Sequence, residues 1–261
     1  MKTFFSRAGN KSRLANVIIP MFPQHTKYVE PFFGSGAIFF NKEKSKVEII
    51  NDIDKDLMNA YNILNEDIDK SKIPKCKTIE SAKQFFDQIL LKDNITIEEQ
   101  LRFYLIKFSG GFNSKPCLKS KNIYKNYQQH TKLNKLDLYQ ERLKNVEILN
   151  TDYKEVIKEY DDDHTLFYLD PPYEGADKIY PGYSHQIDYF VMRDLLKNIK
   201  GLFVLSLNDS DNIKEIFKDF IITIVSVKGQ GFSEIREINE KLSGIGRTIR
   251  KELLISNFIL L

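Results

Sequence analysis

Apolar residues gather along the chain in short runs bounded by glycine, proline or acidic residues, and between many of these runs they recur at helical spacing. Short bounded runs are typical of buried strands, and a period near 3.6 residues is typical of amphipathic helices. The runs predict strands at Lys27–Glu30, Val47–Asn51, Val146–Leu149, Thr165–Leu169, Leu202–Leu207, Ile221–Val227 and Glu252–Phe258. Other segments predict helices at Lys11–Phe22, Gln186–Lys200 and Asn212–Lys218. This alternation predicts an α/β fold with a doubly wound, Rossmann-like sheet.

The first two strands and their connection form one local unit. The strand Lys27–Glu30 leads into the glycine turn Gly34-Ser35-Gly36, and Ala37–Phe40 then has the pattern of the start of a helix. The strand Val47–Asn51 follows, with Asp52 at its carboxyl end. Strand, turn, helix and strand are the βαβ unit that opens a doubly wound sheet.

The pattern changes between residues 56 and 144, where helical periodicity dominates, as in the segments Phe85–Leu90 and Leu101–Phe108. Alternating strands and helices resume at Val146. We therefore expect residues 1–55 and 145–261 to form one catalytic domain, interrupted by a mainly helical insert at residues 56–144.

Charge is distributed unevenly over the 261 residues. The 39 basic and 36 acidic residues leave a net charge of +3, but the window Leu101–Leu136 holds eight basic residues and no acidic one, so the rest carries 31 − 36 = −5. A basic segment on an acidic body indicates contact with a polyanion, and a solvated basic face is the alternative.

Further features restrict the class of protein. Cys76 and Cys117 form no metal-site or disulfide pattern, no apolar run approaches the roughly 18 residues of a membrane span, and the first residues lack a signal-peptide pattern. We expect an intracellular protein, cytoplasmic or associated with the nucleoid, without a bound metal and not in a membrane.

The glycine turn and Asp52 together point to a nucleoside ligand. The turn matches neither GxGxxG nor a P-loop, and alone it is also consistent with an ordinary tight turn. An acidic residue at the end of the next strand is placed to bind ribose hydroxyls. An adenosine-containing ligand without a phosphate-binding loop satisfies both observations.

The segment Asp170-Pro171-Pro172-Tyr173 follows the strand Thr165–Leu169, at the edge of the sheet where open α/β folds place their sites. The prolines stiffen the backbone, so Asp170 and the Pro171 carbonyl are able to accept hydrogen bonds from one exocyclic amino group. The Tyr173 ring is suited to stack on a base. The alternative is a proline-rich turn without a ligand.

Several motifs, in this order, resemble those of the Dam-type DNA adenine-N6 methyltransferases over nearly the whole chain. The matching segments are Ala8-Gly9-Asn10-Lys11, Tyr28–Gly36, Asn51-Asp52-Ile53, Gly111-Phe112-Asn113, the DPPY motif Asp170–Tyr173, and Arg250–Ile255. The resemblance implies S-adenosylmethionine (SAM) as cofactor and no metal. It implies cofactor-binding roles for Arg7, Gly9, Lys11, Glu30, Pro31, Phe32, Gly34, Gly36, Asp52, Ile53 and Asp170, and catalytic roles for Asp170, Pro171, Pro172 and Tyr173. Arg7 departs from the aromatic residue that family members often carry there.

The resemblance further implies that duplex DNA is the partner of a monomer or weak dimer. The target adenine flips out of the helix, Tyr173 stacks on it, and the loop Glu174–His185 either closes over it or is an ordinary surface loop. The residues expected to bind DNA are Lys11, Asn113, Ser114, Lys115, Lys119, Lys121, Lys125 and Tyr127. Lys115-Pro116-Cys117 stands where a guanine-reading arginine is expected, so recognition of GATC does not follow.

Other functions remain open at this point. Cytosine-N4 methylation also modifies an exocyclic amine, although those enzymes favour serine at the position of Asp170. Methylation of RNA or of a protein glutamine is a further alternative, as is a catalytically silent DNA-binding module, against which the intact Asp170–Tyr173 motif and Asp52 weigh.

Overall fold

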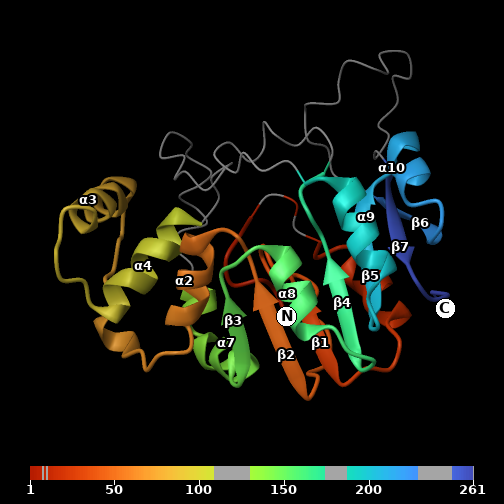
Figure 1. The fold of residues 1–261 in the computed structure, drawn as a ribbon. Helices are drawn as coiled ribbons and strands as arrows, with labels where there is room; N and C mark the ends of the chain where they lie inside the picture. Colours follow the sequence, from red (N-terminus) through yellow and green to blue (C-terminus); the bar gives the residue numbers. More distant parts are fainter. Residues whose placement is uncertain (8, 10, 109–129, 174–186, 229–248, 261) are drawn as a thin grey trace, which may run out of the picture.

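The computed structural model describes residues 1–7, 9, 11–108, 130–173, 187–228 and 249–260 (Figure 1). The described strands form a seven-stranded sheet in the order β3-β2-β1-β4-β5-β7-β6. The strands are β1 (Lys27–Glu30), β2 (Val47–Asn51), β3 (Val146–Leu149), β4 (Thr165–Leu169), β5 (Leu202–Asn208), β6 (Ile221–Lys228) and β7 (Ile249–Ser256). Strands β1 to β5 pair in parallel, whereas β7 is antiparallel to both β5 and β6. The predicted α/β class and Rossmann-like sheet are confirmed.

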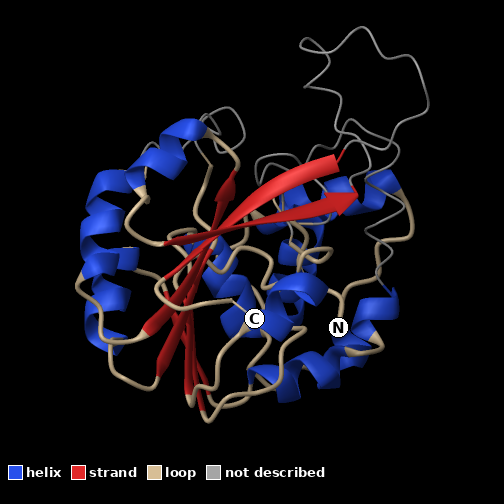
Figure 2. Ribbon diagram, turned by 90° about the vertical axis from the view of Figure 1, so that its right-hand side faces the viewer, coloured by secondary structure: helices blue, strands red, loops and turns tan. Residues whose placement is uncertain are grey.

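Helices lie on both faces of the sheet (Figure 2). They are α1 (Ala15–Ile18), α2 (Lys55–Ile63), α3 (Ile79–Ile89), α4 (Ile97–Lys107), α6 (His130–Leu133), α7 (Leu136–Leu143), α8 (Tyr153–Tyr160), α9 (Tyr189–Lys197) and α10 (Asp211–Ile216), with 3₁₀ turns η1 (Ile19–Met21) and η2 (Lys70–Lys72). Residues of α1, α2, α4 and α7 share one hydrophobic core, and those of α8, α9 and α10 share another. Alternate residues of the strands enter the two cores, as Tyr28 and Val29 of β1 do.

Helices from the predicted insert contribute directly to the first core. Leu57 and Tyr61 of α2, Leu101 of α4 and Tyr139 of α7 are buried there, whereas α3 packs on α4 in a separate small cluster around Phe86. In Figure 1, α3 lies beyond α4, on the side away from β7. Part of the segment 56–144 therefore covers the sheet, and the predicted domain boundaries at the two ends of this segment stay a prediction.

Of the two helices predicted at the start of the chain, one is shorter than expected and the other is absent. The segment Lys11–Phe22 is helical only from Ala15 to Met21 and tightens into η1 at Pro20, because proline lacks the N–H that would extend the α-helix. The segment Ala37–Phe40 is not a helix. Phe40 N–H donates to the Gly36 carbonyl at 2.9 Å, and the segment consists of turns.

The second half differs from expectation at three elements. Helix α8 was not predicted; the Asp152 side chain caps it by accepting from Lys154 N–H, and it buries Val156 and Ile157. Helix α9 is shorter than predicted, because the Asp188 side chain caps its start. Strand β7 begins at Ile249 rather than at the predicted Glu252 and ends at Ser256 rather than at Phe258. It pairs with β6 over this whole length.

Candidate active site

The carboxyl ends of β1, β2 and β4 meet at one edge of the sheet. Strand β1 pairs in parallel with β2 on one side and β4 on the other. The chain winds outward from β1 through β2 and β3, and then returns to β4, so the direction of winding reverses between β1 and β4. Ligands bind at such a switch point in open α/β sheets. This edge collects Glu30 of β1, Asp52 after β2 and Asp170 after β4.

The turn after β1 is held by Asn51, the last residue of β2. Its side-chain amide donates to the Pro31 carbonyl at 2.9 Å and to the Thr151 carbonyl at 3.1 Å, and its backbone carbonyl accepts from Phe33 N–H at 2.8 Å. These bonds tie the turn to the ends of both β2 and β3.

The two glycines of this turn have different surroundings. Gly34 (φ +51°) and Gly36 (φ +67°) both adopt the left-handed conformation that favours glycine. A Cβ atom on Gly36 would lie 2.4 Å from Phe33 Cζ and 2.9 Å from Phe40 Cε2, whereas one on Gly34 would meet nothing within 4 Å. Gly36 is required for packing, and Gly34 borders open space that a ligand is able to enter.

Asp52 is fixed by the backbone around it. Its Oδ2 accepts from Gly34 N–H at 2.8 Å and its Oδ1 from Asp54 N–H at 2.9 Å. Burial raises the pKa of Asp52, and the positive charge of Arg7 and these two amides oppose the rise. Arg7 forms an ion pair with Asp54, so it lies beside the predicted cofactor residues. The neighbouring Ile53 is 53% exposed, which is unusual for an isoleucine and leaves an apolar surface next to Asp52.

Glu30 is a buried carboxyl group at the end of β1, only 2% exposed. Tyr28 donates its hydroxyl hydrogen to Glu30 Oε2 at 2.8 Å. Burial raises the pKa of Glu30 to about 8, and the negative charge of Asp170 adds to the rise. Burial therefore disfavours the charged form of Glu30.

Asp170 pairs with a lysine from the other end of the chain. Lys11 Nζ lies 2.7 Å from Asp170 Oδ1, and both groups are largely shielded from solvent. Burial raises the pKa of Asp170, and Lys11 opposes the rise. Lys11 Nζ also lies 4.6 Å from the centroid of the Tyr173 ring and 3.5 Å from the carbonyl oxygen of Gly9, which itself is exposed.

The rest of the DPPY motif is held from two further elements. Tyr189, the first residue of α9, donates its hydroxyl hydrogen to the Pro172 carbonyl at 2.7 Å. Tyr173 donates to Glu252 Oε2 on β7 at 2.6 Å. Pro171 is buried. The motif is therefore fixed by the N-terminal segment, by α9 and by β7 at once.

Phe32 lies at the same edge, with its ring centroid 5.0 Å from that of Tyr153. The structure thus gathers Arg7, Gly9, Lys11, the Glu30–Gly36 segment, Asp52, Ile53 and Asp170–Tyr173 around the ends of three strands. The predicted DNA-binding residues Asn113, Ser114, Lys115, Lys119, Lys121, Lys125 and Tyr127 lie outside the described residues, as does the loop Glu174–His185.

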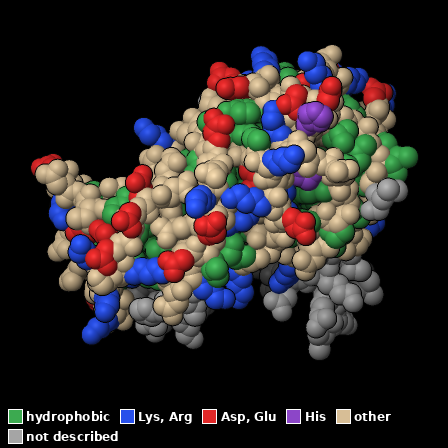
Figure 3. All heavy atoms as spheres, turned by 90° about the horizontal axis from the view of Figure 1, so that it is seen from below, with side chains coloured by type: hydrophobic (Ala, Val, Ile, Leu, Met, Phe, Trp, Pro, Cys, Tyr) green, Lys and Arg blue, Asp and Glu red, His purple; other side chains and the backbone are tan. Residues whose placement is uncertain are grey.

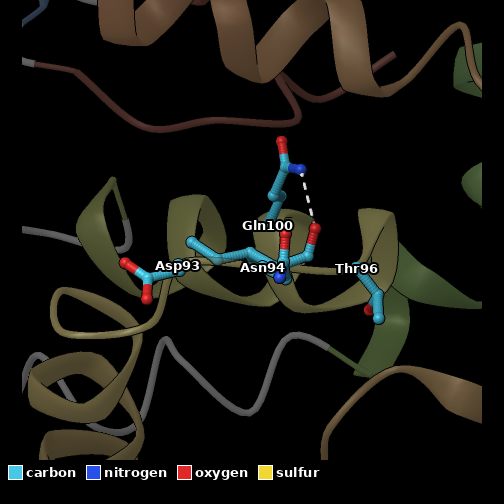
Figure 4. Close-up of a pocket in the computed structure, with 5 residues that line it drawn as sticks. Asp93, Asn94, Thr96 and Gln100 are labelled. Atoms are coloured by element: carbon cyan, nitrogen blue, oxygen red, sulfur yellow. Dashed lines mark hydrogen bonds between the residues drawn. The ribbon is translucent and has the colours of Figure 1, made fainter.

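Two other surfaces do not resemble this site. A hollow of about 440 Å³ at the start of α4 is lined by Asp93, Asn94, Ile95, Thr96 and Gln100, and the Gln100 amide donates to the Ile95 carbonyl at 3.2 Å (Figure 4). The face at the opposite ends of the strands carries acidic and basic side chains interspersed (Figure 3). Among the described residues, no cluster of histidine, cysteine and carboxylate side chains is suited to a metal, and no helix has the length and apolarity to cross a membrane.

A family model described as "D12 class N6 adenine-specific DNA methyltransferase" matches residues 8–230. The chain belongs to this family. It is therefore a methyltransferase that acts on N6 of adenine in DNA, as the resemblance of its motifs to the Dam-type enzymes implied.

Three relatives of this D12 class methyltransferase have names that agree with the family. The chain is 28% identical to a type II methyltransferase, M.MjaIII, of Methanocaldococcus jannaschii, over 68% of this chain and 71% of that protein. It is 26% identical to the type II methyltransferase M1.LlaDCHI of Lactococcus lactis subsp. cremoris, over 85% and 86%. It is 29% identical to a DNA adenine methylase of Haemophilus influenzae, over 66% and 64%.

Sequence reasoning assigned no role to four residues that organise the site of this methyltransferase: Asn51 and Glu252, which lie in the matching segments, and Asp54 and Tyr189. Asn51 directly follows the apolar run of β2, and Glu252 directly precedes the apolar run Leu253–Ile255 of β7. A polar residue next to a buried run needs a partner when it is buried too, so the pattern held a signal for both. Asp54 and Tyr189 are ordinary residues of helix starts, and only the fold shows that they contact Arg7 and Pro172.

Proposed function

We propose that this D12 class methyltransferase uses S-adenosylmethionine as its methyl donor and acts on an adenine flipped out of duplex DNA. The observation that carries the proposal is the Asp170 carboxylate, held by Lys11 at 2.7 Å at the switch point of the sheet, beside the open side of the glycine turn. S-adenosylmethionine supplies an electrophilic methyl group on a sulfonium ion.

The residues at the edge of the sheet fit this cofactor. Asp52 keeps lone pairs for ribose hydroxyls, because each of its oxygens accepts one backbone N–H. The exposed side chain of Ile53 offers an apolar surface for the adenine ring, and the space beside Gly34 allows close approach to the backbone. We assign cofactor binding to Arg7, Gly9, Lys11, Glu30, Pro31, Phe32, Gly34, Gly36, Asp52, Ile53 and Asp170.

Asp170, Pro171, Pro172 and Tyr173 would bind and orient the target base. The N6 lone pair of adenine is delocalised into the ring, so N6 is a weak nucleophile. Hydrogen bonds from N6–H to Asp170 Oδ2 and to the Pro171 carbonyl favour a pyramidal nitrogen, while Lys11 holds Asp170 Oδ1. Transfer would form the N6–CH₃ bond as the S–CH₃ bond breaks, and the N6 proton would be released to solvent. Positioning and electrostatics supply the catalysis, without a metal.

Recognition of duplex DNA is assigned to the segment 56–144 and, within it, to the basic window. Lys119, Lys121 and Lys125 would contact phosphates with support from Tyr127, and Asn113, Ser114 and Lys115 would reach base edges, with Lys11 at the edge of the catalytic site. The enzyme would act as a monomer or weak dimer, in the cytoplasm or on the nucleoid.

The test is to incubate the protein with tritiated S-adenosylmethionine and duplex DNA, digest the DNA to nucleosides, and separate them. Label in N6-methyladenine is expected. Label in N4-methylcytosine would support the cytosine alternative, and no label would support a silent binding module.

Asp170→Ala is expected to abolish transfer and to preserve DNA binding, because it removes the acceptor of the N6 hydrogen bond. Asp163→Ala is the matched control, an exposed aspartate before the same strand, and should leave the rate unchanged. Full activity of Asp170→Ala would contradict the role of this carboxylate.

A further inference from the structure

Strand β7 carries a buried glutamate, Glu252, at the start of its buried part, directly after the exposed Lys251. Glu252 is 6% exposed and is followed by the buried residues Leu253, Leu254 and Ile255. Its backbone is opposite Asn208 of β5 and Val225 of β6, so strands pair with it on both sides and its position is rigid. Burying a carboxyl group costs free energy unless it is hydrogen-bonded, so a glutamate here calls for an explanation.

The contact to Tyr173 provides one. Tyr173 Oη lies 2.6 Å from Glu252 Oε2, across 79 residues of chain. Burial raises the pKa of Tyr173 well above its usual range, and the negative charges of Asp170 and Glu252 contribute, so the hydroxyl stays protonated and remains a donor. The short distance is that of a strong hydrogen bond.

This bond restricts the aromatic ring of Tyr173. A tyrosine ring turns about two side-chain torsions. A bond to its hydroxyl from a rigid strand fixes the direction of the ring, and it favours one plane because a phenol O–H prefers to lie in the plane of the ring. Lys11 Nζ, 4.6 Å from the ring centroid, restrains the ring again through its face. Because Lys11 also holds Asp170, the ring and the carboxylate are aligned with each other.

We propose that Glu252 is a positioning residue for methyl transfer, which holds the Tyr173 ring in the plane on which the flipped adenine stacks. The inference rests on the proposed function of Tyr173 as the stacking surface. Glu252 itself touches neither the base nor the methyl group. A ring free to turn would leave the base able to rotate away from Asp170, and misplacement by about 1 Å lowers rates by on the order of 100-fold.

A double-mutant cycle tests the proposal. Glu252→Ala is expected to lower kcat by about 10- to 100-fold with little change in the KM for the cofactor. In a Tyr173→Phe background, which keeps the ring and removes its hydroxyl, the same substitution is expected to lower kcat by less than about threefold, because the bond is already absent. Glu252→Gln retains an acceptor oxygen and should restore most of the activity.

The position of the base is read separately with DNA that carries 2-aminopurine at the target adenine. The fluorescence change on binding is expected to differ between wild type and Glu252→Ala. It is expected to be the same in Tyr173→Phe and in the double variant that also carries Glu252→Ala. Ser256→Ala is the matched control, since it removes the hydrogen bond of another buried side chain of β7, the one from Ser256 Oγ to the Phe258 carbonyl at 2.7 Å. It should leave kcat and the fluorescence change unaltered.

Equal loss of kcat on Glu252→Ala in both backgrounds would overturn the proposal, as would an equal loss on Ser256→Ala. The unfolding midpoints of wild type, Glu252→Ala, Tyr173→Phe and the double variant show whether the two side chains interact, independently of activity. Coupling in the midpoints but not in kcat would mean that the bond only stabilises the fold, and would also overturn the proposal. An inactive wild-type protein, by contrast, would contradict the proposed function itself.

Discussion

Replacing the two glycines of the turn after β1 by alanine separates packing from ligand access. Both residues have positive φ, so alanine at either position adopts a left-handed conformation that costs roughly 1–2 kcal/mol. At Gly36 the new Cβ would also lie 2.4 Å from Phe33 Cζ. Phe33 is buried, with its ring centroid 4.8 Å from that of Tyr61, so it has little room to move. Forced overpacking of this kind adds about 1–3 kcal/mol.

We therefore expect Gly36→Ala to lower the free energy of unfolding by about 2–5 kcal/mol, and Gly34→Ala by only about 1–2 kcal/mol. Urea unfolding without cofactor, followed by far-ultraviolet circular dichroism, measures both values. For ligand binding, by contrast, Gly34→Ala should have a larger effect than Gly36→Ala. Calorimetric titration with S-adenosylmethionine should show a clear loss of affinity for Gly34→Ala, because the methyl group enters the space assigned to the cofactor.

Equal destabilisation by the two substitutions would refute the steric argument for Gly36. Unchanged affinity of a folded Gly34→Ala protein for S-adenosylmethionine would refute the assignment of the open side of the turn to the cofactor. The two results are independent, since the first is measured without ligand.

Further predictions concern buried charge and DNA contact. Because the pKa of Glu30 is about 8 in the folded protein and 4.5 when unperturbed, folding takes up a proton between these values, and stability falls as pH rises through this window by up to roughly 5 kcal/mol. Glu30→Gln should remove this dependence from unfolding curves measured between pH 5 and pH 8, and an unaltered slope would show that another group causes it. Arg142→Met should cost about 1–3 kcal/mol in urea unfolding, because Glu48, with a side chain 1% exposed, loses the guanidinium group and keeps only Lys42 as a charged partner; a loss under about 1 kcal/mol would contradict this. Lys119→Ala and Lys125→Ala should each flatten the dependence of log Kd for DNA on log salt concentration by about 0.9, with the same sequence preference, and unchanged slopes would argue against phosphate contacts.

The apolar runs of the chain located β1 to β4 without error. In β1, β2 and β4 most residues are buried, and strands buried on both faces are nearly continuous hydrophobic segments. They also located Asp52 and Asp170, which follow such strands directly. Local patterns failed where a single turn decided the outcome. Ala37–Phe40 has the composition of a helix start, but the chain there only turns after Gly36, whose positive φ is not part of a helix.

The amino-acid sequence by itself determined the α/β class, the order of the motifs and the chemistry of the DPPY segment, because these depend on residues that are close together in the chain. The tertiary structure alone decided which residues support that segment. Lys11 reaches Asp170 across 159 residues, and Glu252 reaches Tyr173 because β7 is inserted antiparallel between β5 and β6. Such contacts depend on the spatial order of the strands, and the periodicity of one strand carries no information about its neighbours in the sheet.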